Sequence, residues 1–236
     1  MYIYGKNVVR EKLLTNDKIN KAYVSKKFKD EKIIDELFKR NIRVDFVDNK
    51  VLDRKVDGLH QGIILDIDEI KTYDLKELLN SLKEKEGYKT LVMLDHLEDP
   101  HNFGAIIRTS EALGIDGIII PNDRSVSITP TVVKTSVGAI EHIKIVKVPN
   151  LSATITKLKE EDFWIVGTDM HKEDYNTIDY NMNVCLIIGN EGKGISNTIK
   201  QQCDFIASIP MKGKINSLNA SVSCGIILSK IVSGRK

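Results

Sequence analysis

The sequence predicts an α/β protein with two domains, a small amino-terminal one and a larger carboxy-terminal one built on a mostly parallel sheet. Two observations lead to this prediction. Apolar runs typical of strands alternate with helical patterns along the whole chain, and from about residue 90 the strands become continuously apolar. Continuously apolar strands are typical of parallel sheets that helices cover on both faces.

In the first 70 residues, helical patterns alternate with short strands. The helical patterns are GKNVVREKLL (5–14), EKIIDELFKR (31–40) and NKVLDRKV (49–56), and the strands are KAYVS (21–25), RVDFV (43–47) and QGIILDI (61–67). A unit of about 70 residues can fold by itself. Residues 71–88 carry a charged helical pattern, for which we expect a linker helix. The expected domains are therefore 1–70, the linker 71–88 and 89–236.

The carboxy-terminal part shows six stronger strands with helices between them. The strands are TLVMLD (90–95), GIIIP (117–121), IKIVKV (143–148), FWIVGTD (163–169), VCLIIGN (184–190) and FIASIP (205–210), and a last helix covers CGIILSKIV (224–232). In open α/β sheets the ligand lies beyond the carboxyl ends of the strands. The segments that follow strands are therefore the candidate functional site.

The composition is typical of a soluble globular protein, with 42% hydrophobic and 29% charged residues. No apolar run approaches the roughly 20 residues of a membrane span, and the first residues lack the features of a secretory signal. We therefore expect a cytoplasmic protein. Three cysteines without a CxxC spacing (Cys185, Cys203 and Cys224) indicate reduced, buried thiols rather than a disulfide frame or a zinc site.

The charge is balanced overall but not locally. The net charge is +2, whereas residues 18–43 contain nine Lys and Arg against four acidic residues. A basic face of this kind can bind phosphates, with Lys26, Lys27, Lys29 and Arg40 as candidate contacts to RNA. An ordinary lysine-rich surface would explain the same pattern.

Two loops after strands contain candidate site residues. In GNEGKG (189–194), three glycines allow a ligand to approach the backbone closely. The GxxGxG spacing fits neither the Rossmann fingerprint nor the P-loop, so a binding loop and a plain turn remain open. In DPHNFGAIIRT (99–109), Asn102 is a candidate helix cap, and Arg108 follows six residues later. The nearby histidines match no familiar ligand spacing, and we expect no metal.

The stretch NSLNASVS (216–223) places several short polar side chains where the last helix begins. One capping side chain would be enough for a helix start. A redundant polar loop is one explanation. The other is a ligand held at the joint between strand and helix, for which short polar side chains and free helix-start N–H groups are suited.

Three of these segments resemble, in order, the three motifs of the SpoU group of RNA ribose 2′-O-methyltransferases. The matching segments are DPHNFGAIIRTSEALG (99–114), IIGNEGKGIS (187–196) and IPMKGKINSLNASVSCGI (209–226). YGKNVVREKL (4–13) and GLHQGI (58–63) also resemble the substrate-binding domain of the bacterial 23S rRNA (guanosine-2′-O)-methyltransferase subgroup. Almost the whole chain is covered, apart from the expected linker helix.

The resemblance implies a fold and partners that composition does not show. It implies a deep trefoil knot near the carboxyl terminus, an exception to the rule that chains avoid threading. It implies a small first domain similar to ribosomal L30e-like proteins. It also implies a homodimer in which each active site draws on both chains, with rRNA as substrate and S-adenosylmethionine as cofactor.

The resemblance also assigns roles to residues. The implied catalytic set is Arg108, Asn102, Glu191, Ser217 and Asn219. The implied cofactor-binding set is Thr168, Gly189, Gly192, Ile209, Pro210, Ser217 and Leu218, of which the apolar members would bind through their backbones. Simple core packing is the alternative for Ile209 and Leu218.

The role of Arg108 is open at this level. In the family, this arginine is assigned to activating the ribose 2′-hydroxyl, which is a very weak acid. A guanidinium is normally protonated and is therefore an awkward general base. Arg108 would either lose its proton with help from a substrate phosphate or stay charged and stabilise the developing alkoxide.

Other functions remain as alternatives. A tRNA ribose methyltransferase and a resistance-type rRNA methyltransferase belong to the same class. A non-catalytic RNA-binding protein belongs to another, and the intact set of five candidate catalytic residues speaks against it. A nicotinamide-dependent oxidoreductase is disfavoured because the dinucleotide fingerprint is missing.

Overall fold

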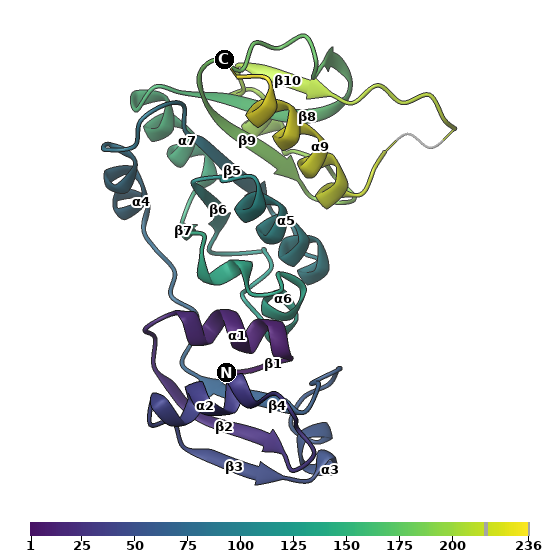
Figure 1. The fold of residues 1–236 in the computed structure, drawn as a ribbon. Helices are drawn as coiled ribbons and strands as arrows, with labels where there is room; N and C mark the ends of the chain where they lie inside the picture. The colour runs from purple at the N-terminus through teal and green to yellow at the C-terminus, as the bar shows by residue number, and fades with distance from the viewer. Residues whose placement is uncertain (215–216, 236) are drawn as a thin grey trace. The chain divides into compact units, whose positions relative to one another are not determined.

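The computed structural model describes residues 1–214 and 217–235, and the side chain of His171 is outside the description. The chain forms two compact units (Figure 1). Unit 1 consists of Met1–Lys71 and Ile128–His142, and unit 2 consists of the rest. Each unit contains its own sheet.

Unit 1 is built on a mixed four-stranded sheet with the order β1-β4-β2-β3. Its strands are β1 (Tyr2–Tyr4), β2 (Ile19–Ser25), β3 (Val44–Val47) and β4 (Ile63–Ile67), and its helices are α1 (Lys6–Leu14), α2 (Glu31–Lys39), α3 (Asn49–Asp53), α6 (Pro130–Thr135) and the 3-10 turn η1 (Ala139–Glu141). Only β2 and β3 pair in parallel. The short strand β1 was not foreseen, because three residues are too few to show a periodic pattern.

Helix α2 shows how the sequence produces one of these elements. Asp30 caps the helix, since its Oδ1 accepts a hydrogen bond from the backbone N–H of Ile33. Ile33 and Leu37 lie four residues apart, so they fall on the same face, and both are buried. Burial of this face against the sheet stabilises a helix that would be too short to persist alone.

Residues 128–142 belong to unit 1 although they lie between β6 and β7 of unit 2 in the sequence. Buried charges attach them to α1: Nζ of Lys12 lies 2.9 Å from Oε2 of Glu141, and both side chains are 5% exposed. On the surface, Nε2 of His142 lies 2.9 Å from Oε2 of Glu11. Local pattern cannot reveal which domain a helix packs against, so the sequence suggested only consecutive domains.

Unit 2 is built on a six-stranded parallel sheet with the order β10-β8-β9-β5-β6-β7. Its strands are β5 (Thr90–Asp95), β6 (Gly117–Pro121), β7 (Ile145–Val148), β8 (Phe163–Asp174), β9 (Asn183–Gly189) and β10 (Phe205–Ser208), and its helices are α4 (Leu75–Leu82), α5 (Pro100–Ala112), α7 (Leu151–Glu160), α8 (Asn197–Lys200) and α9 (Ala220–Ser233). Every residue of β5 is buried, as a central parallel strand requires.

The expected linker helix is the shorter helix α4, and it contributes to the core of unit 2. Leu78 and Leu82 are buried in the same hydrophobic cluster as Met93 and Ile119 of the sheet. Its first turn is held by a capping box between Asp74 and Glu77. In the part of the chain that the structure describes, no helix is both long and apolar enough to cross a membrane.

Candidate functional site

A cavity of about 780 Å³ lies at the carboxyl ends of β8, β9 and β10 in unit 2. Its lining comes from residues within 168–174, 188–194, 207–211 and 217–220, together with Ser223 and Ile227 of α9. All seven expected cofactor-binding residues line it: Thr168, Gly189, Gly192, Ile209, Pro210, Ser217 and Leu218. Its volume is in the range of small-molecule sites.

Strand β8 reaches the cavity through an irregularity in its pairing. The ladder with β10 steps from the pair Ile206–Gly167 directly to the pair Ala207–Glu173. Residues 168–172 therefore bulge out of the ladder, and four of them line the cavity. The sequence pattern predicted a strand that ends at residue 169, whereas β8 continues beyond the bulge to Asp174.

The loop GNEGKG (189–194) is organised by the side chain of Asn190. Its Oδ1 accepts hydrogen bonds from the backbone N–H groups of Gly192 and Lys193, at 3.0 and 3.2 Å. Its Nδ2 donates to the carbonyl of His96 at the end of β5, at 2.9 Å. The backbones of Asn190 and Gly194 exchange two further hydrogen bonds. Asn190 therefore fixes both the shape of the loop and its position at the end of the sheet.

Gly189 is required by this loop for a reason other than a special backbone angle. Its φ is not positive, whereas that of Gly194 is +65°. A Cβ atom on Gly189 would overlap the backbone of Gly194 and Ile195. A Cβ on Gly192 would meet only Oδ1 of Asn190, at 3.6 Å. The space beside the Cα atom of Gly189 is thus occupied primarily by the backbone of the same loop rather than reserved for a ligand.

Asp95, the last residue of β5, holds the segment that directly follows this loop. Its side chain is 1% exposed, and Oδ2 accepts a hydrogen bond of 2.7 Å from the backbone N–H of Ser196, directly after the loop. Oδ1 lies 2.6 Å from Nδ1 of His96. Sequence reasoning missed Asp95 and Asn190, although a carboxylate ending a continuously apolar strand was a usable signal.

The three motif segments meet in a chain of hydrogen bonds. Nδ2 of Asn102 donates to Oε1 of Glu191 at 3.1 Å, and Nδ2 of Asn219 donates to Oδ1 of Asn102 at 2.8 Å. Asn102 is 6% exposed, whereas Glu191 and Asn219 line the cavity. Each motif thus contributes one member of the chain.

The helix caps differ in part from the expectation. Helix α5 is capped by Asp99, whose Oδ1 accepts from the N–H of His101, and Pro100 occupies its first position. Asn102 therefore lies inside the helix and is not its cap. Helix α9 is capped by Asn219, whose Oδ1 accepts from the N–H groups of Ser221 and Val222. Asn216 lies outside the described residues.

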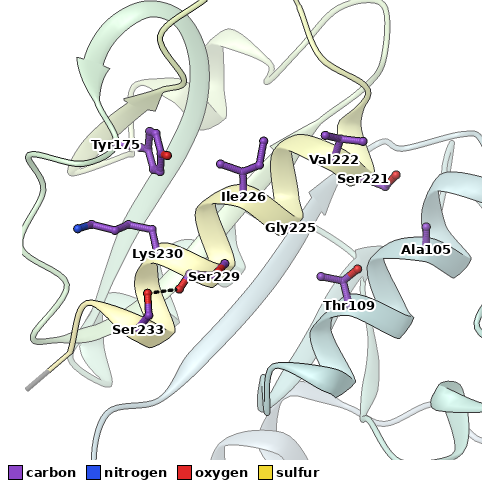
Figure 2. Close-up of a pocket in the computed structure, with 10 residues that line it drawn as sticks. All are labelled: Ala105, Thr109, Tyr175, Ser221, Val222, Gly225, Ile226, Ser229, Lys230 and Ser233. Carbon is purple, nitrogen blue, oxygen red and sulfur yellow. Dashed lines mark hydrogen bonds between the residues drawn. The ribbon is translucent and has the colours of Figure 1, made fainter.

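Arg108 lies apart from this network. Its side chain is exposed on α5, it is not part of the cavity lining, and within residues 1–214 and 217–235 no hydrogen bond or ion pair to it is found. It follows Ala105 by one helical turn and precedes Thr109, and both of these line a second, shallower hollow of about 720 Å³ between α5 and α9. Figure 2 shows this hollow, with Val222, Gly225 and Ile226 on the α9 side.

Asp169 is the most strongly held carboxylate of the cavity wall. Partial burial opposes its ionisation, but hydrogen bonds from Nζ of Lys200 (2.7 Å) and from the backbone N–H of Met170 (2.8 Å) lower the pKa of Asp169 below its ordinary value. Asp174 and Glu191 also line the cavity. Lys172 and Lys193 line the same cavity, so its wall carries groups of both charges.

Residues 89–229 match the SpoU rRNA Methylase family, and residues 2–73 match the family of RNA 2′-O ribose methyltransferase substrate-binding domains. The chain belongs to the SpoU methylase family. A Bacillus subtilis protein named as a TrmH family tRNA/rRNA methyltransferase is 40% identical over 99% of this chain and 96% of its own length. A Staphylococcus aureus protein of the same name is 41% identical with the same coverage.

Solved structures agree with this assignment. The AdoMet-bound rRNA methyltransferase of Sinorhizobium meliloti is 26% identical, with a TM-score of 0.81 over 99% of this chain and 87% of that one. The TrmH/SpoU tRNA modifying enzyme of A. aeolicus is 29% identical, with a TM-score of 0.56 over 67% of this chain and 81% of that one. As a SpoU methylase, this chain is an RNA ribose 2′-O-methyltransferase.

The four candidate RNA contacts lie in unit 1, in different situations. Lys26, Lys27 and Lys29 are exposed in the loop between β2 and α2. Lys26 forms an exposed ion pair with Asp48 at 3.3 Å. Arg40 instead donates hydrogen bonds to the carbonyls of Leu13 and Asp17. Two N–H groups of its guanidinium are therefore bound to carbonyls at and just after the end of α1. A contact of Arg40 with RNA stays a prediction.

Proposed function

We propose that the cavity of unit 2 binds S-adenosylmethionine and that the enzyme methylates the 2′-hydroxyl of a guanosine in 23S rRNA. The observation that carries the proposal is that the second and third motif segments line one cavity, and that Asn102 of the first segment is hydrogen-bonded to Glu191 and Asn219 of its wall. The cofactor supplies an electrophilic methyl group on a sulfonium centre, which requires no metal.

The lining fits this cofactor. Gly189, Ile209 and Leu218 offer backbone N–H and carbonyl groups to an adenine ring, and Ile209 and Leu218 add apolar surface. Thr168 lies near them and anchors its own hydroxyl to the carbonyl of Ile187 at 3.0 Å. The carboxylates of Asp169 and Asp174 favour the positive charges of the sulfonium and amino groups.

The polar residues have distinct roles in the proposal. Asn102 and Asn219 hold Glu191 in place, so that its Oε2, which accepts no hydrogen bond in the described part of the chain, is available to substrate. Ser217, which lines the cavity, contacts RNA or the methionine end of the cofactor. Holding the ribose oxygen in line with the methyl group supplies several kcal/mol of the required rate acceleration.

Arg108 completes the active site in a homodimer. It carries no partner in the described chain and borders the hollow between α5 and α9, where Val222 is 49% exposed. We propose that a second copy covers this hollow and that Arg108 of one chain faces the cavity of the other. We also propose that the loops around the cavity form a trefoil knot and that residues 1–70 bind the RNA, as an L30e-like domain in a cytoplasmic enzyme.

The test is methyl transfer from labelled S-adenosylmethionine to 23S rRNA and, separately, to tRNA, followed by mapping of the modified nucleotide. We expect 2′-O-methylguanosine in 23S rRNA. Methylation confined to tRNA would show that tRNA, not 23S rRNA, is the substrate, while the proposed reaction, ribose 2′-O-methylation, would stand. A modified nucleotide that confers drug resistance would indicate the resistance-type alternative. Absence of transfer to both RNAs, despite cofactor binding, would contradict the proposed function.

A further inference from the structure

One end of the sheet of unit 1 gathers loops with an unusual combination of side chains. Strands β1, β2 and β3 end there, and β4, which is antiparallel to β1 and β2, begins there. The segments Gly5–Lys6, 25–30 and 58–62 therefore lie together. We call this surface the loop end and define it by its exposed or partly exposed side chains: Lys6, Lys26, Lys27, Lys29, Leu59 and Lys134.

The loop GLHQG (58–62) is held rigidly at its base. His60 is buried, its Nδ1 accepts a hydrogen bond from the N–H of Gly62, and its Nε2 lies 2.9 Å from Oδ1 of Asp53. Gln61 has a φ of 55°, and its Oε1 accepts from the N–H of Lys6 at 2.8 Å. Both sides of the loop are thus fixed by specific hydrogen bonds.

This rigid loop presents Leu59 to solvent. The side chain is 74% exposed, whereas the carbonyl of the same residue accepts a hydrogen bond of 3.0 Å from Nζ of Lys134. A single exposed leucine is ordinary by itself. Here its backbone is fixed on both sides, so the side chain cannot turn inward without breaking those contacts.

Lysines surround this leucine. The backbone N–H of Ser25 donates to the carbonyl of Gly62, which joins the lysine-rich loop 25–30 to the loop that carries Leu59. Phe28 packs beside Gly62, and Nζ of Lys6 lies 5.2 Å from the centre of the Phe28 ring. Lys27 and Lys29 have no ion-pair partner among the residues that the structure describes. Of the neighbouring acids, Asp48 and Asp53 are engaged by Lys26 and His60, whereas the exposed Asp57 forms no ion pair with the described residues, so lysines outnumber free acids at this end.

From these contacts we infer that the loop end holds an unpaired stretch of the substrate RNA, with Leu59 against the face of a base and Lys27 and Lys29 on phosphates. The inference rests on the proposed function, because it takes RNA as the partner. Charge complementarity favours a polyanion. An apolar side chain favours unpaired nucleotides, since their base faces are already exposed, whereas those of a duplex are reached only by unstacking a base step.

The test compares two full-length variants with matched controls. The first is Leu59→Ser, with Leu14→Ser as control, because Leu14 is 75% exposed in the same unit. The second is Lys27→Gln with Lys29→Gln, and its control is Lys18→Gln with Lys39→Gln, two exposed lysines at the opposite end of the sheet. The probes are a fluorescein-labelled RNA hairpin with a large unpaired loop and a fully paired RNA duplex of the same length. Binding is measured by anisotropy at several salt concentrations.

We expect Leu59→Ser to weaken hairpin binding about tenfold and to leave duplex binding unchanged. We expect the double lysine variant to weaken binding to both RNAs and to lower the slope of log affinity against log salt by about 1.5. The controls should match the wild type, and cofactor affinity should be unchanged in all variants. Because Leu59 makes little contact with the core, its variant should fold, and thermal unfolding checks this.

Two results would overturn the inference: wild-type hairpin affinity in both loop-end variants, or equal losses in the controls. Either result leaves methyl transfer by the wild-type enzyme untouched. The proposed function fails separately, if the wild-type enzyme binds RNA but transfers no methyl group to it.

Discussion

The cavity of unit 2 and the loop end of unit 1 are built in opposite ways. The cavity uses short side chains and backbone groups whose positions are fixed by buried partners such as Asp95 and Asn102. The loop end uses long lysine side chains, of which Lys27 and Lys29 are exposed around one fixed leucine. Precise hydrogen bonding suits a small cofactor, whereas mobile charges suit an RNA backbone. The comparison predicts that substitutions in one region change one binding constant only.

Arg108 should produce the largest effect, because it belongs to neither region within one chain. We expect Arg108→Ala to retain cofactor affinity and to slow methyl transfer by about two orders of magnitude or more, the range for loss of a charge-stabilising donor or a general base. Single-turnover kinetics measure this.

Arg108→Lys separates the two readings of the role of Arg108. A charged stabiliser should be partly replaced by lysine at all pH values, since the charge is kept and only the planar fork is lost. A general base should show recovery that increases with pH toward about 10.4, the ordinary pKa of lysine. A wild-type rate for Arg108→Ala would contradict both readings.

Gly189 and Gly192 form a matched pair within the cavity. We expect Gly189→Ala to destabilise the protein by about 1–3 kcal/mol, because the added Cβ overlaps the backbone of Gly194 and Ile195. We expect Gly192→Ala to be nearly neutral, since its Cβ has room. Thermal unfolding and calorimetric titration with S-adenosylmethionine measure both. Equal behaviour of the two variants would show that loop closure does not depend on Gly189.

Asn190 should have a smaller effect that is confined to the cofactor. Asn190→Ala removes three hydrogen bonds from the loop, and we expect cofactor affinity to fall about tenfold, equivalent to about 1.4 kcal/mol. Asn190→Asp keeps the acceptor toward Gly192 and Lys193 but loses the donor to His96, so we expect an intermediate loss. RNA affinity should not change in either variant. A loss of RNA affinity equal to the loss of cofactor affinity would show that the cavity and the loop end do not act separately.

The ion pair between Asp169 and Lys200 should give the smallest effect. Hydrogen bonding lowers the pKa of Asp169, so its stabilising contribution is present above the unfolded-state pKa and is lost as pH falls through the lower folded-state value. Lys200→Met should raise that pKa, which carbon-detected NMR titration of the carboxylate can follow. An unchanged titration curve in Lys200→Met would assign the low pKa to the Met170 N–H instead.

Much of the fold could be predicted from the sequence, because local pattern determines most elements. The continuously apolar strands indicated a parallel sheet, and the sheet of unit 2 is parallel. The attachment of residues 128–142 to unit 1 could not be predicted, since it depends on long-range contacts such as Lys12 with Glu141. The packing of α4 could not be predicted either: it lies in the expected linker 71–88, but its Leu78 and Leu82 are buried in the core of unit 2.

For the candidate site, the segments were easier to predict than the contacts within them. Motif resemblance identified the residues of the second and third segments that line the cavity, since both segments follow strands and strand ends meet at one edge. The first segment reaches the cavity wall only through the hydrogen bonds of Asn102. The supporting residues Asp95 and Asn190 were missed, because their importance lies in hydrogen bonds to the backbones of Ser196, Gly192 and Lys193. The position of Asp95 at the end of an apolar strand was a usable signal, but the backbone partners of both side chains have no signature in sequence spacing. The assignment of Asn102 as a cap was wrong because Asp99 and Pro100 already begin the helix.

The central claim is that the cavity of unit 2 is the S-adenosylmethionine site. The most direct measurement is a crystal structure of the full-length protein with S-adenosylmethionine bound. We expect the adenine beside the backbones of Gly189, Ile209 and Leu218, with the methyl group directed toward Glu191 and toward Arg108 of a second chain. Cofactor located away from residues 188–194, 207–211 and 217–220, or a cavity filled by side chains of the second copy, would contradict this assignment.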